Sequence, residues 1–376
     1  MKTDTNKFLS VLAVLLALGA AAGPAFAQPA YQLTDLGTIG GSTSVAHAIN
    51  ASGQIVGESV VFGEAEMHAF LYSNGTMTDL GTFGGSGSRA YAINNRGEVV
   101  GESVVFGEME RHAFLCRDGA DLTDLGTLGG TRSRANGINA AGQVVGESLL
   151  ADKTQRHGFV FSGGAMADVG SLGAGASSFY NTINGVNSSG QMAGVYLRTD
   201  FWSHAFVLGR GVLTDLGTLG GQSSAAMAIN DFGLVVGYST LPGETATHAF
   251  LYGGGVMNDL GTLAGSFSYA LAVNNAGQVV GYSTAAVSST DADGNVTTVT
   301  RLHAFLHTGG VMYDLNDLVD PTSAEFTVLT NAKGINDRGL IVGYGTKADG
   351  MTHAFLLTPV STGADDEPAA PDPTSG

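Results

Sequence analysis

The chain contains a single cysteine, Cys116, among 376 residues. One thiol cannot form an intramolecular disulfide, so packing has to hold the fold, and Cys116 is expected to be a buried, inert thiol. Charged residues make up only 13% of the chain, and 16 Lys and Arg face 33 Asp and Glu, for a formal net charge of −17. Because an acidic protein repels phosphate backbones, nucleic acid is not an expected partner.

Helical periodicity is also missing. Beyond residue 27 no segment repeats apolar residues every 3.6 positions, and no apolar run there is long enough to cross a membrane. Glycine is abundant instead, at 57 residues. A chain so rich in turn formers and so poor in helical pattern is predicted to be all-β.

The N-terminus has the pattern of a secretory signal peptide. Lys2 and Lys7 precede an apolar run over 8–22, and a small-x-small cleavage signal ends at Ala27. This pattern predicts removal of residues 1–27. The protein is therefore expected to be secreted, either to the periplasm or to the extracellular medium.

The C-terminal stretch 360–376 is acidic and rich in Pro and Ala. Such a composition buries too little apolar surface to fold, so we expect a disordered tail. The segment between the two ends, 28–359, is predicted to form one repeat domain.

A three-part motif recurs seven times through this domain: T-D-L-G-T-L-G-G, then A-I-N-x-x-G-x-V-V-G, then H-A-F-L. Successive Asp residues are about 44–55 positions apart, a period typical of arrays and propellers. The motif's Asp occurs at Asp35, Asp79, Asp124, Asp168, Asp215, Asp259 and Asp314. Its Asn occurs at Asn50, Asn94, Asn139, Asn187, Asn230, Asn274 and Asn336. Its His occurs at His68, His112, His157, His204, His248, His303 and His353.

Each repeat reads as four short strands. In the second repeat, 89–94 and 98–103 are predicted strands joined by a turn, in which Asn94 bonds back to the backbone and Gly97 takes a positive φ. Asn74-Gly75 predicts a two-residue type I′ hairpin between the third and fourth strands. The Gly after each Val-Val pair predicts a bulge or a close backbone approach, which we ascribe to crowding near a central axis.

The two ends of the domain complement each other. Segment 31–36 is a fourth strand without a third, and 353–357 is a third strand without a fourth. Pairing them predicts a closed seven-bladed β-propeller of four-stranded blades, in which the N-terminal strand completes the last blade. A linear solenoid is the alternative, but it would need atypical capping ends.

The motifs H-A-F-L-Y-x-x-G, D-L-G-T-L-G-G and A-I-N-N-x-G-Q-V-V-G together resemble the bacterial HAF-repeat family of predicted extracellular repeat proteins. The resemblance covers about residues 31–359, with departures in the fourth repeat and in the divergent seventh. It implies export and a repeat fold, and it brings no catalytic residues.

The repeated His and Asp are predicted to interact within each blade. The hairpin register places Asp79 opposite Phe70, which makes His68 its diagonal neighbour on the same face. We expect structural hydrogen bonds rather than a metal site, because one His and one Asp are too few ligands, and we expect no cofactor. The pairs singled out are His68–Asp79, His204–Asp215, His248–Asp259 and, across the closure, His353–Asp35.

The segment Asp291–Asn295 in the sixth repeat hints at a calcium loop through its D-x-D-x-N pattern. It lacks the later bidentate Glu of such loops. We favour a hairpin tip at Asp293-Gly294.

A binding surface is predicted where the loops between second and third strands share a face with the connections between blades. Loops on a rigid scaffold often carry function, and aromatic rings with Arg suit sugars or an acidic partner. Alternatively, these rings pack between blades. Trp202, Tyr180 and Arg134 are predicted to form a shallow cleft. The candidate ligand-binding residues are Trp202, Phe201, Tyr180, Arg134, Arg132 and Arg89, with Phe62, Phe106, Phe179, Phe267 and Tyr269 on the same face.

These observations predict an exported, non-enzymatic binding or structural module with a glycan or protein partner. The alternative is a polysaccharide-acting enzyme, a lyase or hydrolase, since propellers host many chemistries. Its acid–base candidates on the loop face would be Glu64, Glu66, Glu108, Glu110, Asp152 and Lys153.

Overall fold

The computed structural model describes residues 30–360 except 62, 64–65, 108–109, 118, 120, 153, 173–179, 291–294 and 321–324. The predicted signal peptide and all but the first residue of the predicted tail therefore lie outside the described residues. The same holds for the candidates Phe62, Glu64, Glu108, Lys153, Phe179 and the tip 291–294 of the possible calcium loop.

The described chain is all-β apart from one short 3-10 helix, and its strands form antiparallel sheets. We call each four-stranded repeat a unit. Units one to three comprise β2 (Gly40–Ile49), β3 (Ile55–Val61), β4 (Met67–Ser73) and β5 (Thr76–Asp79); β6 (Gly84–Ile93), β7 (Val99–Val105), β8 (Arg111–Cys116) and β9 (Thr123–Asp124); and β10 (Gly129–Ile138), β11 (Val144–Leu150), β12 (Arg156–Ser162) and β13 (Ala165–Asp168).

Units four to six follow the same order. They comprise β14 (Asn181–Val186), β15 (Met192–Leu197), β16 (Ser203–Gly209) and β17 (Val212–Asp215); β18 (Ser224–Ile229), β19 (Val235–Thr240), β20 (Thr247–Gly253) and β21 (Val256–Asp259); and β22 (Ser268–Val273), β23 (Val279–Thr290), β24 (Val296–Thr308) and β25 (Val311–Asp314). The helix η1 (Leu315–Asp317) leads to the last unit, made of β26 (Phe326–Ile335), β27 (Ile341–Lys347), β28 (Thr352–Pro359) and β1 (Tyr31–Asp35).

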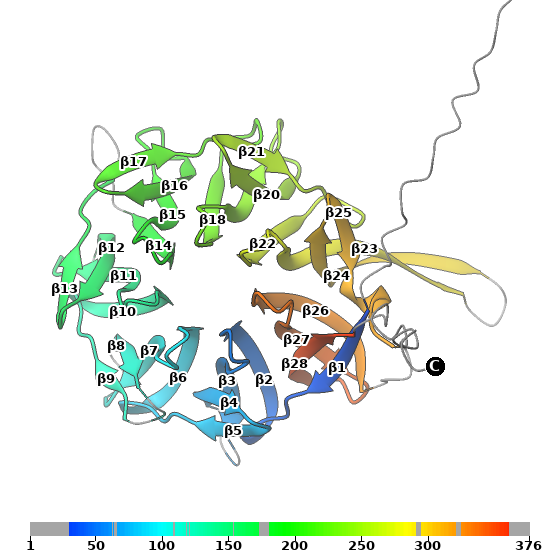
Figure 1. The fold of residues 1–376 in the computed structure, drawn as a ribbon, viewed down its shortest axis with the longest axis horizontal. Coiled ribbons are helices and arrows are strands. Elements are labelled where there is room, and N and C mark those ends of the chain that lie inside the picture. The colour runs from blue at the N-terminus through cyan, green and yellow to red at the C-terminus, as the bar shows by residue number, and fades with distance from the viewer. Residues whose placement is uncertain are drawn as a thin grey trace, which may run out of the picture.

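The units are arranged around a common centre, with their first strands innermost and their fourth strands outermost (Figure 1). Units two and three are merged into one eight-stranded sheet by a single parallel pair, Arg111 with Arg132. The β23–β24 hairpin is longer than its equivalents and projects beyond the other units (Figure 1).

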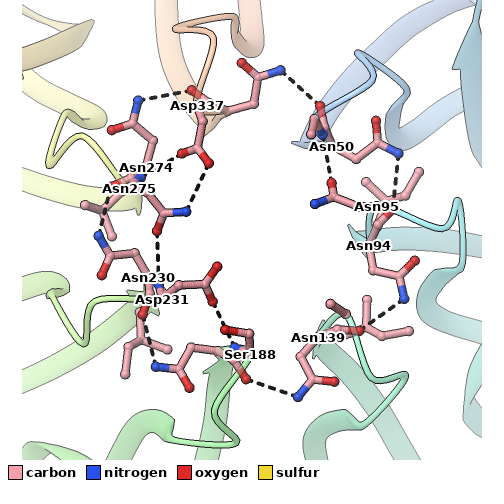
Figure 2. Close-up of a pocket in the computed structure, with 18 of the residues that line it drawn as sticks. Asn50, Asn94, Asn95, Asn139, Ser188, Asn230, Asp231, Asn274, Asn275 and Asp337 are labelled. Atoms are coloured by element: carbon pink, nitrogen blue, oxygen red, sulfur yellow. Dashed lines mark hydrogen bonds between the residues drawn. The ribbon is translucent and has the colours of Figure 1, made fainter.

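The motif asparagines bind each unit to the next. Asn50 Nδ2 donates to the backbone oxygen of Asn94 at 3.1 Å, and the same bond recurs through the series until Asn336 Nδ2 donates to the oxygen of Asn50 at 3.0 Å. The intermediate donors are Asn94, Asn139, Asn187, Asn230 and Asn274. Figure 2 shows five of these side chains around the central opening: Asn50, Asn94, Asn139, Asn230 and Asn274. The series of bonds therefore returns to its starting residue.

The predicted local role of these asparagines is also present. Asn94 Oδ1 accepts from the backbone N–H groups of Arg96 and Glu98, and Gly97 has a φ of 78°. In the sequence, this turn alone accounts for the Asn, and the bond to the next unit was not predicted.

The hairpins between third and fourth strands have the predicted geometry. Asn74 and Gly75 have φ values of 52° and 81°, and Arg210 and Gly211 have 51° and 76°. Positive φ at both central residues defines the type I′ turn. The pairing that follows places Asp79 opposite Phe70, as the sequence predicted.

Each unit buries a phenylalanine from its third strand, and the glycine after the Val-Val pair makes room for it. A Cβ at Gly57 would collide with the carbonyl oxygen of Val45 and lie 2.8 Å from the Phe70 ring. The register of β2 and β3 shifts between Ala46 and Ala48, so a bulge lies opposite this glycine. The prediction of a bulge or close approach is correct, but the crowding atoms belong to the same sheet and not to the axis.

The first strands are longer than predicted. In unit two the strand begins at Gly84 rather than Arg89, because Gly84 pairs with Val105 and the Phe83 N–H donates to Ser103 Oγ at 2.9 Å. The Gly-Gly-Ser stretch is thus part of the sheet, with a register shift between Gly84 and Ser88.

The N-terminal strand β1 completes the sheet of β26, β27 and β28. Tyr31 pairs with Pro359 and Asp35 with Phe355. Asp35 also accepts from Lys347 Nζ at 2.6 Å and from His353 Nδ1 at 2.9 Å. Strand pairing and charge therefore hold the two ends of the domain together.

Deleting residues 28–37 should lower the free energy of unfolding by several kcal/mol, because it removes a strand ladder and the buried side chains of Tyr31 and Leu36. Thermal melts and size-exclusion chromatography measure the effect. Thr34→Ala, at an exposed position of the same strand, should stay within about 0.5 kcal/mol of wild type. A truncated protein that melts like wild type and stays monodisperse contradicts the role of β1.

Asn139→Asp should destabilise the protein by about 1–3 kcal/mol, because the buried backbone oxygen of Asn187 loses its donor. Chemical denaturation measures the change. Asn95→Asp is the matched control, since Asn95 contributes only its Oδ1 as acceptor for the Ala51 N–H, and a carboxylate retains that role. Equal stability of the two variants would show that the bonds between units contribute little.

Candidate functional site: the mouth of the central channel

The first strands of the units enclose a central channel with two cavities. One, of about 280 Å³, lies at the asparagine end (Figure 2) and is lined by the motif asparagines and the residues after them, including Asp231 and Asp337. The other, of about 520 Å³, lies further along the first strands. Ile and Val side chains such as Ile49, Ile93 and Ile335 line both cavities and mark where they meet.

The larger cavity is lined by one position that differs from unit to unit. This position lies three residues before the motif Asn, between small or aliphatic residues that scarcely change. Its occupants are His47, Tyr91, Asn136, Asn184, Met227, Leu271 and Lys333, and all of them line the cavity. The repeated scaffold therefore presents an irregular set of side chains at its centre.

Units one to three surround the cavity's mouth with ion pairs. Arg89 bonds Glu58 through Nε and lies 3.5 Å from Glu102. Tyr91 donates its hydroxyl to Glu102 at 3.1 Å. Glu147 continues the pattern, with Arg156 at 3.1 Å and Arg134 at 3.7 Å.

Units five to seven carry tyrosines where units one to three carry these glutamates. Tyr238, Tyr282 and Tyr344 follow the same strand glycine as Glu58, Glu102 and Glu147. Tyr269 lies between two of them, with ring centroids 4.5 Å from Tyr238 and 5.0 Å from Tyr282, and it is stacked on the latter. At this motif position, units one to three are thus ionic and units five to seven aromatic.

The two halves meet at both ends. Arg156 lies over the ring of Tyr180 at 5.7 Å. Burial raises the pKa of Tyr238, and the neighbouring Tyr269 and Tyr180 raise it further. At the other end, Lys333 lies 5.9 Å from the Tyr344 ring and interacts electrostatically with His47 and Glu58. We call this continuous series the belt; it comprises Glu58, Arg89, Tyr91, Glu102, Arg134, Glu147, Arg156, Tyr180, Tyr238, Tyr269, Tyr282, Tyr344, Lys333 and His47.

Burial changes the acid–base properties of the belt. It lowers the pKa of His47, partly offset by the hydrogen bond to Glu58, and it lowers the pKa of Lys333. It also raises the pKa of Tyr91, and with Tyr269 it raises that of Tyr282 to about 12. The cavity therefore holds two bases that lose protons more readily than usual.

The candidate residues from the sequence fall into two groups. Arg89, Arg134 and Tyr180 belong to the belt, and Arg132 lies beside it in a groove with Arg111, Arg134 and Arg156. Trp202 is 43% exposed and Phe201 72% exposed, and both lie in the loop between β15 and β16. Arg134 lies over the ring of Tyr91 at 5.4 Å, and the shallow cleft of Trp202, Tyr180 and Arg134 stays a prediction.

The belt's tyrosine half was missed in the sequence, apart from Tyr180 and Tyr269. A signal was present, since a glutamate in three repeats becomes tyrosine in three others at one motif position. Phe106, another candidate, is 86% exposed on its loop.

The repeated His and Asp are hydrogen-bonded in every unit. His68 Nδ1 lies 2.9 Å from Asp79, His204 2.8 Å from Asp215, His248 2.9 Å from Asp259 and His353 2.9 Å from Asp35. Each Asp except Asp314 also accepts from the backbone N–H of the glycine two residues on, as Asp79 does from Gly81 at 2.7 Å. Among the residues that the structure describes, no group of three or more His, Cys, Asp and Glu is arranged to hold a metal ion.

The loop carboxylates considered for acid–base chemistry lie on separate loops. Glu66 lines a groove between units one and two, Glu110 lies 3.4 Å from His112, and Asp152 accepts from the N–H groups of Thr154 and Gln155. The possible calcium segment joins β23 to β24, a hairpin as predicted, but its tip lies outside the described residues. Within the described ranges, no helix has the length and apolar character needed to span a bilayer.

Comparisons with known proteins give fold-level likeness only. No family model matches the sequence, and no curated protein matches it. Solved structures that resemble it include a puromycin-hydrolysing peptidase of Mycobacterium tuberculosis (12% identity, TM-score 0.49), TolB of Acinetobacter baumannii (13%, 0.37) and the Aleuria aurantia lectin (13%, 0.31). The alignment with the peptidase covers 89% of this chain and 55% of the peptidase. The alignment with TolB covers 81% and 79%, and the alignment with the lectin covers 88% and 100%, in the same order. At this similarity they identify neither a ligand nor a reaction.

Acid should destabilise the protein partly through the pair of His204 and Asp215. Burial raises the pKa of Asp215, but hydrogen bonds from His204, Gly217 and Tyr196 outweigh it and lower the value to about 2. A depressed carboxyl pKa stabilises the fold above the unfolded value near 3.8, and this stability is lost as the pH falls toward 2. Asp215→Asn should therefore show a shallower fall in melting temperature between pH 4 and pH 2 than wild type. Thr214→Ala, an exposed change in the same strand, should keep the wild-type slope.

Proposed function

We propose that the chain is a closed seven-bladed β-propeller, exported and non-enzymatic, that binds a glycan or a protein at the mouth of its channel. The closing strand β1 and the returning series of asparagine bonds support closure. Export rests on the signal-peptide pattern of residues 1–27. The HAF-repeat resemblance agrees with both.

One observation carries the binding function. Repeat proteins hold their framework residues constant, and here the Asn, Gly, His, Phe and Asp of the motif recur while the channel-lining position holds seven side chains of six kinds. A structural scaffold does not need this variety. Recognition does, because a ligand of defined chemistry requires different groups at different places.

The composition of the belt favours a sugar-bearing ligand. Tyr269 and Tyr282 offer stacked rings, and Lys333 supplies a polar group at the cavity wall. Flat rings beside a few placed polar groups are typical of sites for small polar molecules. Trp202 and Phe201 lie on a loop that starts next to Tyr180, because the backbone N–H of Leu197 donates to the backbone oxygen of Tyr180 at 3.1 Å.

A glycan array probed with residues 28–376 should show binding that depends on the belt. Tyr282→Leu and Lys333→Met, the latter placing at unit seven the residue of unit five, should each weaken binding about tenfold through lost stacking or charge. Phe232→Ala is the control, since this exposed aromatic follows Asn230 at the other end of the channel. Equal binding by wild type and both belt variants would contradict the placement.

Trp202 reports how far the ligand extends. Its exposed indole should be quenched readily by acrylamide in the ligand-free protein. If the ligand protects Trp202 from acrylamide, the β15–β16 loop is part of the binding site. If quenching is unchanged, the site is confined to the belt.

A second candidate is a polysaccharide lyase, favoured by the basic groups in the cavity. His47 and Tyr91 have ring centroids 5.3 Å apart, Lys333 acts on His47 electrostatically, and burial lowers the pKa of both His47 and Lys333. A base of lowered pKa suits proton abstraction next to a carboxylate, with Tyr91 as acid toward the leaving oxygen. Ultraviolet absorbance from an unsaturated uronate product would support the lyase. Glycan binding without such a product would support the non-enzymatic binding module.

A further inference from the structure

Two grooves on the same face of the protein are equivalent by the repeat but differ in charge. The first, between units one and two, has a volume of about 330 Å³ and is lined by two arginines, Arg89 and Arg111, and two glutamates, Glu66 and Glu102. The second, between units two and three, has a volume of about 260 Å³. It is lined by Arg111, Arg132, Arg134, Arg156, Glu102 and Glu147. We call the first the neutral groove and the second the arginine groove.

Two substitutions within the repeat account for much of the difference. Met67 precedes the motif His in unit one, and Arg111 takes this place in unit two. Gly87 precedes Ser88 in unit two, and Arg132 precedes the equivalent Ser133 in unit three. Neither arginine side chain is required for strand pairing, because β3 pairs with β4 and β6 pairs with β7 where Met67 and Gly87 stand at these places.

The carboxylates of the arginine groove cannot neutralise all its guanidinium groups. Glu147 is shared by Arg156, Arg134 and the Thr182 hydroxyl, which donates at 2.6 Å. Glu102 is shared by Arg89, Arg111 and Tyr91. Arg132 is exposed and has no carboxylate partner among the described contacts. Four arginines against two glutamates leave about two positive charges in a chain of net charge −17.

We propose that the arginine groove binds the carboxylate of a uronic acid residue in the glycan that the belt recognises. Guanidinium groups match a carboxylate with paired N–H donors, which Lys does not. Arg134 lines both the groove and the channel cavity, so one sugar chain reaches both places. This inference rests on the proposed function and specifies its ligand.

The overall negative charge of the protein restricts the kind of acidic glycan that can bind. Charges more than about 8 Å away are largely screened at physiological salt, so the local excess of arginine decides binding of one carboxylate. A dense polyanion would also approach the acidic remainder of the surface and be repelled. The expected ligand is therefore a glycan with separated carboxylates.

The test is ligand-observed NMR with glucuronic and galacturonic acid, each against its neutral parent, glucose or galactose. At least one acid should bind residues 28–376 about tenfold more tightly than its parent, and added salt should reduce this preference. Arg132→Thr, which installs the Thr43 residue of unit one, should abolish the preference. Arg301→Thr removes the same charge from an exposed position of β24 outside the groove and should keep it.

A gain of function keeps the test independent of any loss of folding. Met67→Arg gives the neutral groove one of the arginine groove's guanidinium groups, and it should create a second, weaker site for the acid. Equal binding of acid and parent sugar, or equal behaviour of Arg132→Thr and Arg301→Thr, overturns the inference. Neutral glycans that still bind through Tyr282 would leave the proposed function intact, whereas no sugar binding at all would remove this inference together with the glycan ligand of the proposed function.

Discussion

The structure depends on the hydrogen bond that each motif asparagine makes to the backbone of the next unit. Its amide holds the turn of its own unit through Oδ1 and the neighbouring unit through Nδ2. A buried amide that lost one of these partners would cost about 1–3 kcal/mol, so each asparagine stabilises its own turn and the contact with the next unit. Local turn geometry and the placement of whole sheets are therefore fixed by one side chain, repeated at each inner corner.

Because the motif asparagines fix the inner strands, the position three residues earlier can vary in chemistry, although Asn136 and Asn184 at this position also donate to backbone oxygens of the next unit. His47 and Leu271 occupy the same place in two units, although their chemistry differs completely. The framework tolerates this because neighbouring alanine, glycine and isoleucine positions supply the packing. Variation is thus concentrated where a ligand can reach it, while the outer His–Asp pairs remain uniform.

Much of the fold was predictable because it repeats. The type I′ hairpins, the opposition of Asp79 and Phe70, and the pairing of Tyr31–Asp35 with the last strand follow from local pattern and chain ends. The longer first strands were not predicted, since Gly-Gly-Ser has no strand preference and is held by tertiary partners such as Ser103. The cross-unit bond of Asn94 was hidden because its turn already explained the residue.

The candidate site was harder to predict for a related reason. A consensus reveals what the scaffold needs, whereas a binding site consists of departures from it, and Tyr238 or Arg132 is visible only when the repeats are compared position by position. Trp202 is the single tryptophan of the chain, and its place on the β15–β16 loop could be predicted from the spacing of the repeat motifs. Which departures meet in space depends on the arrangement of units, which no single repeat contains.

Pairing of the first strand with the last has a consequence for biosynthesis. The contact between Asp35 and His353 spans 318 residues, so closing it directly in an unfolded chain would cost about 5 kcal/mol of loop entropy. Once the other units have assembled, β1 is tethered by only a few residues beside its partner, and the cost nearly disappears. Docking of β1 should therefore be the last step of folding. Until the final repeat is in place, both sheet edges stay open to pairing with other chains, so a chain that ends before this repeat is expected to associate through its open edges.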